Sequence, residues 1–104
     1  MIVEERVYTL HPGKVPEMVR LYGEEGLALQ QKYLGRFLGY FTAETGELNQ
    51  VVFMWGFDSV EDRAARRERM AQDPQWQQYL KKVLPLLVKQ ENRLLRPTAF
   101  SPIR

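Results

Sequence analysis

The sequence predicts an α+β protein whose elements follow the order strand, helix, strand, strand, helix, strand. Two observations predict this order. Runs of aromatic and β-branched residues alternate with segments of helical apolar periodicity, and two of those runs are separated only by a short glycine-containing connection. The chain has 104 residues, of which 44% are hydrophobic and 27% charged, so we expect one domain over residues 1–104.

A strand and a helix are predicted in the first third of the chain. Residues 2–10 are rich in Ile, Val, Tyr and Thr and end at the Pro- and Gly-containing turn of residues 11–13, which is typical of a strand. From there to about residue 33, apolar residues recur at three- and four-residue steps. This spacing predicts a helix, and Gly23 and Gly26 weaken it.

A hairpin is predicted in the middle of the chain. Residues 36–44 and 50–57 are both aromatic and β-branched, and residues 45–49 connect them. Ser59, with Asp62 three residues on, then resembles a capping box that begins a second helix.

The second helix is predicted in two segments and is followed by a last strand. Asp73 and Pro74 form a cap-then-proline signal that starts the second segment, which is interrupted near Pro85. Residues 89–95 alternate charged or polar with apolar residues, and Pro97 bars a helix beyond them. We expect a fourth strand there.

This order is that of the ferredoxin-like split βαβ motif, an antiparallel sheet with helices on one face. Both sets of alternate side chains on the strands include apolar residues, such as Val7 against Tyr8 and Val52 against Phe53. Two helices cover only one face of such a sheet. A second copy of the sheet, related by a two-fold axis, would cover the other face, so we expect a homodimer.

Composition excludes several classes of function. There is no cysteine, which removes disulfide and thiolate chemistry, and the formal charge of +2 is too small to indicate nucleic acid. No apolar run reaches the roughly 18 residues of a membrane span. Carboxylates near the strand ends lack the spacing of metal ligands, and we expect no metal and no cofactor. The N-terminal segment has the pattern of a strand rather than of an Arg- and Ser-rich presequence, so we expect a cytoplasmic protein.

An ordered set of short motifs along nearly the whole chain resembles the NIPSNAP family. The motifs are residues 5–10 with Pro12-Gly13, Leu34-Gly35-Arg36 with Gly39-Tyr40-Phe41, residues 48–52 with Trp55, Arg63, Asp73-Pro74 with Trp76, and Glu91-Asn92-Arg93 before Pro97. The resemblance implies a dimeric α/β barrel, in which two ferredoxin-like sheets face each other and enclose a cavity. It implies no settled biochemical activity. Where many relatives carry a histidine two residues before the tryptophan, this chain has Phe53, which weakens any acid-base mechanism.

Candidate ligand-binding residues are the aromatic and polar residues of the strands. They are Arg6, Tyr8, Tyr40, Asn49, Phe53, Trp55 and Arg93. Either these residues line the barrel cavity and bind a small apolar or aromatic ligand there, or the barrel is filled by its own side chains and Arg6 pairs with a carboxylate such as Glu91. The sequence leaves both readings open.

The alternative function is an enzyme resembling the cofactor-independent monooxygenases that share this barrel. Those enzymes hold an oxidisable aromatic substrate with Asn, Trp, Tyr and Arg side chains, and Asn49, Trp55, Tyr8 and Arg93 supply these types. A run of arginines on the second helix is interspersed with acidic residues and predicts a solvated helix face rather than a phosphate site. The arginines are Arg63, Arg66, Arg67 and Arg69.

Overall fold

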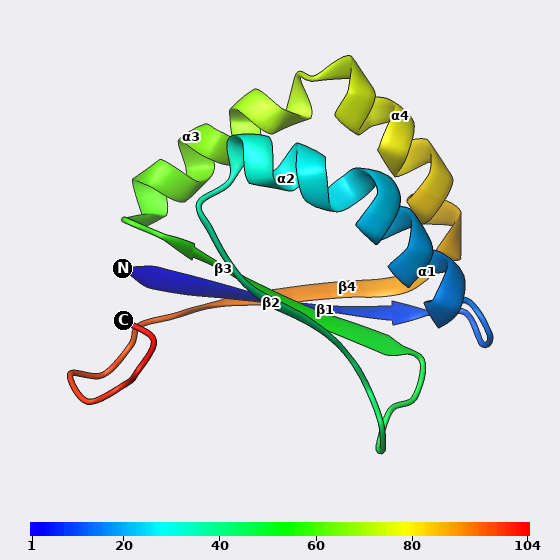
Figure 1. Ribbon diagram of the computed structural model, residues 1–104, viewed down its shortest axis with the longest axis horizontal. Coiled ribbons are helices and arrows are strands. Elements are labelled where there is room, and N and C mark those ends of the chain that lie inside the picture. The colour runs from blue at the N-terminus through cyan, green and yellow to red at the C-terminus, as the bar shows by residue number, and fades with distance from the viewer.

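Helices lie against one face of a four-stranded antiparallel sheet, and the other face carries none (Figure 1). The computed structural model describes residues 1–104. In chain order the elements are β1 (Ile2–Leu10), α1 (Val15–Leu21), the π-helix η1 (Tyr22–Gly26), α2 (Leu27–Tyr33), β2 (Arg36–Thr42), β3 (Gln50–Phe57), α3 (Val60–Ala71), α4 (Pro74–Val83), the 3₁₀ turn η2 (Leu84–Leu86) and β4 (Leu87–Leu95).

The sheet order is β2-β3-β1-β4, which confirms the predicted ferredoxin-like topology. Two strand boundaries differ from the prediction. β2 ends at Thr42 instead of residue 44, because its pairing with β3 stops where Thr42 meets Val51. β4 begins at Leu87, directly after η2, two residues earlier than predicted.

The first predicted helix is continuous in space but changes type at its centre. Its middle turn is the π-helix η1, which contains both Gly23 and Gly26. A Cβ atom on Gly26 would lie only 2.5 Å from Cζ of Tyr79, so this glycine lets the α4 tyrosine approach the backbone. Gly23 has open space around it. The packing of Tyr79 against this helix therefore requires a residue without a side chain at position 26, although glycine lowers the helix propensity there.

The second helical region begins with two side-chain caps, as predicted. Ser59 Oγ accepts a hydrogen bond from the Asp62 N–H at 3.0 Å, and Asp73 Oδ1 accepts one from Gln75 N–H at 2.7 Å. The Asp62 carboxylate does not complete a capping box with Ser59, because it accepts from the Asp58 N–H and from Arg66 instead.

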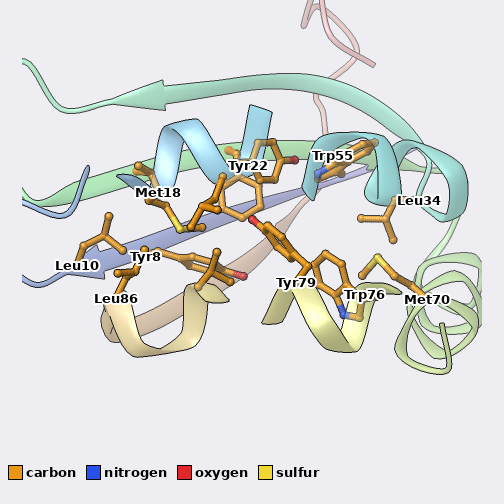
Figure 2. Close-up of a cluster of buried hydrophobic side chains, with 14 of the residues drawn as sticks. Tyr8, Leu10, Met18, Tyr22, Leu34, Trp55, Met70, Trp76, Tyr79 and Leu86 are labelled. Atoms are coloured by element: carbon orange, nitrogen blue, oxygen red, sulfur yellow. The ribbon is translucent and has the colours of Figure 1, made fainter. Parts of the chain in front are cut away.

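The core lies between the sheet and the helices (Figure 2). Even-numbered side chains of β1 and odd-numbered side chains of β3 face the helices, since Arg6 pairs with Phe53 and Tyr8 with Val51. Phe53 and Trp55 are almost fully buried. Arg6, Tyr8, Phe53 and Trp55 therefore share the helix-covered face of the sheet.

The opposite face of the sheet is open and mixed in character. Register partners Val7 and Val52 are half-buried at its centre, and Phe41, the neighbour of Val52 on β2, is 52% exposed. Glu5 and Arg93 form an ion pair of 2.7 Å beside them. None of the helices is long and apolar enough to traverse a lipid bilayer.

Candidate functional site

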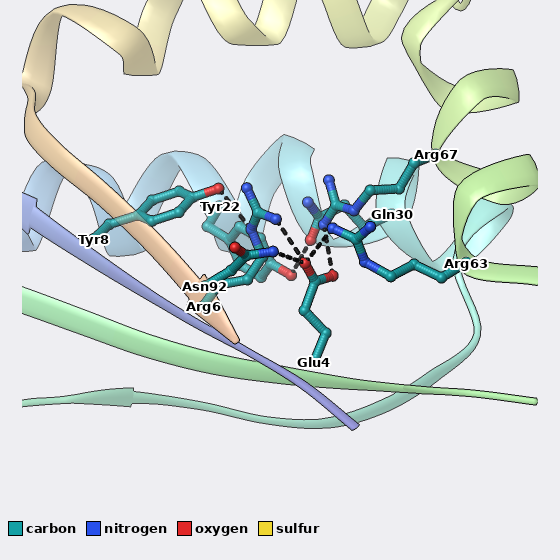
Figure 3. Close-up of polar contacts among 8 residues, drawn as sticks. All are labelled: Glu4, Arg6, Tyr8, Tyr22, Gln30, Arg63, Arg67 and Asn92. Carbon is teal, nitrogen blue, oxygen red and sulfur yellow. Dashed lines mark hydrogen bonds and ion pairs between the residues drawn. The ribbon is translucent and has the colours of Figure 1, made fainter. Parts of the chain in front are cut away.

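Glu4 is the most unusual residue of the core, because it is a carboxylate with no exposed surface. It lies at the centre of a polar cluster, defined here as Glu4, Arg6, Arg63, Arg67 and Asn92 (Figure 3). Its oxygens accept hydrogen bonds from Arg6 at 2.8 Å, Arg63 at 2.5 Å, Arg67 at 3.3 Å and Asn92 at 2.8 Å. These donors come from β1, α3 and β4, so one carboxylate links three elements.

The cluster holds more positive than negative charge. Three guanidinium groups surround one carboxylate, and the only ion pairs that they form are with Glu4. Burial alone would raise the pKa of Glu4, but the hydrogen bond from Arg63, the charge of Arg67 and the other contacts lower that pKa to about 2. Burial lowers the pKa of the Arg67 guanidinium, and the nearby charge of Arg6 lowers it further. The arginines therefore repel one another as well as attracting Glu4.

Aromatic rings occupy the space next to this cluster. Tyr40 stacks on both Tyr22 and Phe53, with ring centroids 4.2 Å and 5.0 Å apart, and Tyr8 meets Phe53 edge to face at 5.0 Å. Tyr8 also joins the two regions, because its hydroxyl accepts a hydrogen bond of 3.0 Å from Nε of Arg6. The aromatic and charged parts are thus one continuous environment.

A small cavity lies among these rings. Its volume is about 20 Å³, and ten of its twelve lining residues are hydrophobic. Tyr8, Tyr22 and Phe53 border it from the sheet and η1, and Tyr79 and Leu84 border it from α4 and η2. A cavity of this size holds about one water molecule. It accommodates an aromatic ring only if the surrounding helices or side chains move.

Several buried polar atoms around the cavity and the cluster have no hydrogen-bond partner. They are the hydroxyls of Tyr40 and Tyr79, Nε1 of Trp55, and Nε of Arg63 and Arg67. Burial raises the pKa of Tyr40 and of Tyr79, so both hydroxyls stay protonated. Because buried polar groups are nearly always satisfied in native proteins, this concentration marks the region as a candidate ligand site.

The structure brings five of the seven predicted candidates to this helix-covered face, and not to the open face where two sheets would enclose a barrel cavity. Two lie together on β1, two on β3 and one on β2: Arg6, Tyr8, Phe53, Trp55 and Tyr40. Arg93 points away from them, since it pairs with Glu5 on the open face. Asn49 precedes β3, where its carbonyl accepts from Leu10 N–H, and six residues of extended chain, roughly 20 Å, separate it from Trp55.

The structure corrects two expectations about charged residues. Arg6 does pair with a carboxylate, but its partner is Glu4 and not Glu91, which lies on the opposite face and contacts Lys89. The run of arginines on α3 is not one solvated face, because Arg63 and Arg67 turn inward while Arg66 pairs with Asp62 as predicted. The buried carboxylate of Glu4, 59 residues away from Arg63, supplies the attraction.

A larger groove lies on the outer surface, between α2 and α4. It has a volume of about 600 Å³, and Glu25, Lys32 and Gln78 are among its lining residues. It is open, and none of the unpartnered buried atoms belongs to its lining. The interior region is the better candidate.

Comparison with known proteins places the chain in a family. The sequence model of the NIPSNAP family matches residues 3–102. The chain belongs to the NIPSNAP family. Human "Protein NipSnap homolog 3A" is 38% identical over 69 residues, which is 66% of this chain and 28% of that protein. Drosophila melanogaster "Protein NipSnap" is 31% identical over 101 residues, which is 97% of this chain and 36% of that protein. The chain thus spans about a third of the length of these relatives.

Solved structures of bacterial NIPSNAP proteins share the whole fold. A NIPSNAP family protein of Agrobacterium tumefaciens is 47% identical with a TM-score of 0.96, and the match covers 99% of this chain and 98% of that one. Protein Atu4242 of the same organism is 38% identical with a TM-score of 0.98 over 100% of both chains. A putative antibiotic biosynthesis monooxygenase from Nitrosomonas europaea has a TM-score of 0.70 at 9% identity, covering 93% of this chain and 98% of that one. The last likeness concerns the fold alone.

Proposed function

We propose that this NIPSNAP protein is a homodimer that binds a small aromatic molecule between its sheet and its helices. The observation that carries the proposal is a pair of unpartnered buried hydroxyls at an aromatic cavity. Tyr79 lines the cavity, and Tyr40 stacks on Tyr22 and Phe53, which line it. Leaving a buried hydroxyl without a partner costs about 1–3 kcal/mol. A ligand that offers hydrogen-bonding groups beside an aromatic ring recovers that cost.

Binding requires the cavity to widen from about 20 Å³. The elements that border it are suited to such a change, because η1 is a π-helix and η2 is a 3₁₀ turn, and both have weaker hydrogen-bond geometry than an α-helix. Leu84 lines the cavity and is 48% exposed, so its side chain stands between the cavity and solvent. The ligand enters past Leu84, and its ring packs against Phe53 and Tyr79.

Titration with small aromatic compounds, followed by ¹H–¹⁵N and aromatic ¹H–¹³C NMR spectra, tests this proposal. The expected result is that signals of Phe53, Tyr79 and Leu84 shift together and saturably. Ala28 and Leu29, which line the outer groove between α2 and α4, serve as the internal control. Shifts confined to Ala28 and Leu29, or no shifts with any aromatic compound, contradict binding in the interior.

The dimer part of the proposal rests on the open face of the sheet. Val7, Val52 and Phe41 form an apolar centre there, and the Glu5–Arg93 pair lies beside it. An apolar centre with a charged rim is the usual anatomy of a protein interface. A second copy related by a two-fold axis supplies the same surface, so the apolar centres of the two copies meet and each Glu5–Arg93 pair lies at the edge of the contact.

Binding is favoured over oxidation of an aromatic substrate. The resemblance to the putative antibiotic biosynthesis monooxygenase is a likeness of fold at 9% identity. A monooxygenase-like site would need Asn49 and Arg93 beside Trp55, but Asn49 lies at the far end of β3 and Arg93 on the opposite face of the sheet. The four residues that this alternative function expected together, Asn49, Trp55, Tyr8 and Arg93, are therefore not together.

A further inference from the structure

We propose that Arg6, Arg63 and Arg67 bind a doubly charged oxyanion, so that the ligand is an aromatic phosphate monoester. The proposed function supplies only the aromatic part of this ligand. The anionic part stands on a separate observation, which is the charge balance of the polar cluster around Glu4.

The three guanidinium groups carry three positive charges, and Glu4 is the only carboxylate within 4 Å of any of them. Two positive charges are therefore unmatched. Their side chains are only 15%, 20% and 20% exposed, so water screens these charges less than it would at the surface. One dianion neutralises the cluster, whereas a carboxylate leaves one charge unmatched.

The donors needed for such a group are free. Each arginine uses one or two nitrogen atoms on Glu4 or Tyr8, and Nε of Arg63 and Nε of Arg67 have no partner at all. Glu4 holds the three guanidiniums close to one another without consuming these atoms. Arginine presents its donors in a planar fork that fits phosphate oxygens, and its bonds to phosphate are among the strong hydrogen bonds of proteins.

The cluster and the cavity are adjacent, so one molecule reaches both. Tyr8 borders the cavity and its hydroxyl is bonded to Arg6, and Gln30 borders the cavity while bonded to Tyr22. Arg63 and Arg67 are one helical turn apart on α3 and face the same carboxylate. A phosphate at the arginines thus places an ester-linked ring toward Phe53.

Isothermal titration in phosphate-free buffer with phenyl phosphate, benzoate, phenol and inorganic phosphate tests the proposal. Phenyl phosphate is expected to bind most tightly, and inorganic phosphate to bind measurably. Arg67→Met is expected to weaken phenyl phosphate binding roughly tenfold or more, because it removes a charge-assisted hydrogen bond. The matched control is Arg69→Met on the same helix, whose exposed side chain forms no ion pair, and it is expected to bind like the parent.

The outcomes separate the two proposals. If phenol binds and phenyl phosphate binds no tighter, the phosphate proposal is overturned and the aromatic one stands. If inorganic phosphate binds as tightly as phenyl phosphate, the ring adds no affinity. The aromatic proposal is then overturned, and only the anion site at the arginines stands. Equal affinity of the Arg67→Met and Arg69→Met variants also overturns the phosphate proposal. If Arg67→Met does not fold, Arg67→Lys keeps the positive charge beside Glu4 but removes Nε and the planar fork, and its loss of phosphate binding provides the same test.

Discussion

The carboxylate of Glu4 on β1 accepts a hydrogen bond from the guanidinium of Arg63 on α3, 2.5 Å away and 59 residues distant in the chain. The pair crosses the boundary between the sheet and the helical layer (Figure 3). Because Glu4 also accepts from Arg6, Arg67 and Asn92, it holds together the three arginines of the proposed phosphate site.

Glu4→Gln is expected to destabilise the protein by about 3–5 kcal/mol, because it leaves three partly buried guanidiniums without a counter-charge. Urea denaturation at pH 7 measures the change in the free energy of unfolding. Glu24→Gln, which removes only an exposed ion pair with Arg20, is the control and is expected to cost less than about 1 kcal/mol. Equal effects of the two substitutions would show that the Glu4 cluster contributes little to folding.

Stability is expected to fall between pH 4.5 and pH 2. The pKa of Glu4 is lowered in the folded state from an ordinary 4.5 to about 2, so the unfolded chain takes up this proton first as the pH drops. The contribution is fully present above pH 4.5, amounts to about 3 kcal/mol, and is lost as the pH falls toward 2. Unfolding curves of the parent and of Glu4→Gln should therefore converge toward pH 2, and a difference that stays constant over this range would contradict the assignment.

Two glycines of η1 are expected to respond in opposite directions to alanine. Gly26→Ala places a methyl group 2.5 Å from Tyr79 and should cost about 1–3 kcal/mol through overpacking. Gly23→Ala meets nothing within 4 Å and should stabilise the helix by about 0.5–1 kcal/mol. Thermal unfolding of both variants checks the pair, and a neutral Gly26→Ala would mean that Tyr79 does not lie against this backbone.

Truncation of Trp55 to alanine is expected to cost about 3–5 kcal/mol, because the indole is completely buried and packs on Phe37. Tyr8→Phe keeps the ring and loses only the hydroxyl that accepts from Arg6, so it should cost about 1 kcal/mol. Chemical denaturation distinguishes the two. A melting temperature unchanged by Trp55→Ala would place the indole outside the core.

The open sheet face is expected to make the chain dimeric at micromolar concentration. Light scattering should give a mass near twice 12.3 kDa. Val52→Lys places a charge at the centre of that face and should yield monomers, whereas Val19→Lys, at an exposed position on α1, should leave the dimer intact. A monomeric parent protein contradicts the dimer proposal.

The strands and helices were predictable because their signals are local. Period-two alternation fixed the face of Tyr8, Phe53 and Trp55, and the caps at Ser59 and Asp73 marked where helices begin. The close contact between Gly26 and Tyr79 was not predictable, since Tyr79 comes from another helix far along the chain.

The charged part of the site was missed for a different reason. Mixed arginines and acids on α3 have the pattern of a solvated helix, and nothing nearby in the chain contradicts it. Two signals were nevertheless present. Arg63, Arg67 and the buried Met70 follow a helical spacing that puts them on one face, and Glu4 shares the inward parity of Tyr8. Together these two signals place the carboxylate of Glu4 and the guanidiniums of Arg63 and Arg67 in the space between the sheet and the helices.

A crystal structure of the protein with phenyl phosphate shows whether the arginines around Glu4 and the aromatic cavity form one binding site. The phosphate is expected within hydrogen-bond distance of Nε of Arg63 and Arg67, and the ring is expected in a widened cavity beside Phe53 and Tyr79. A ligand bound in the groove between α2 and α4, or a cavity still at about 20 Å³ under saturating ligand, would contradict this expectation.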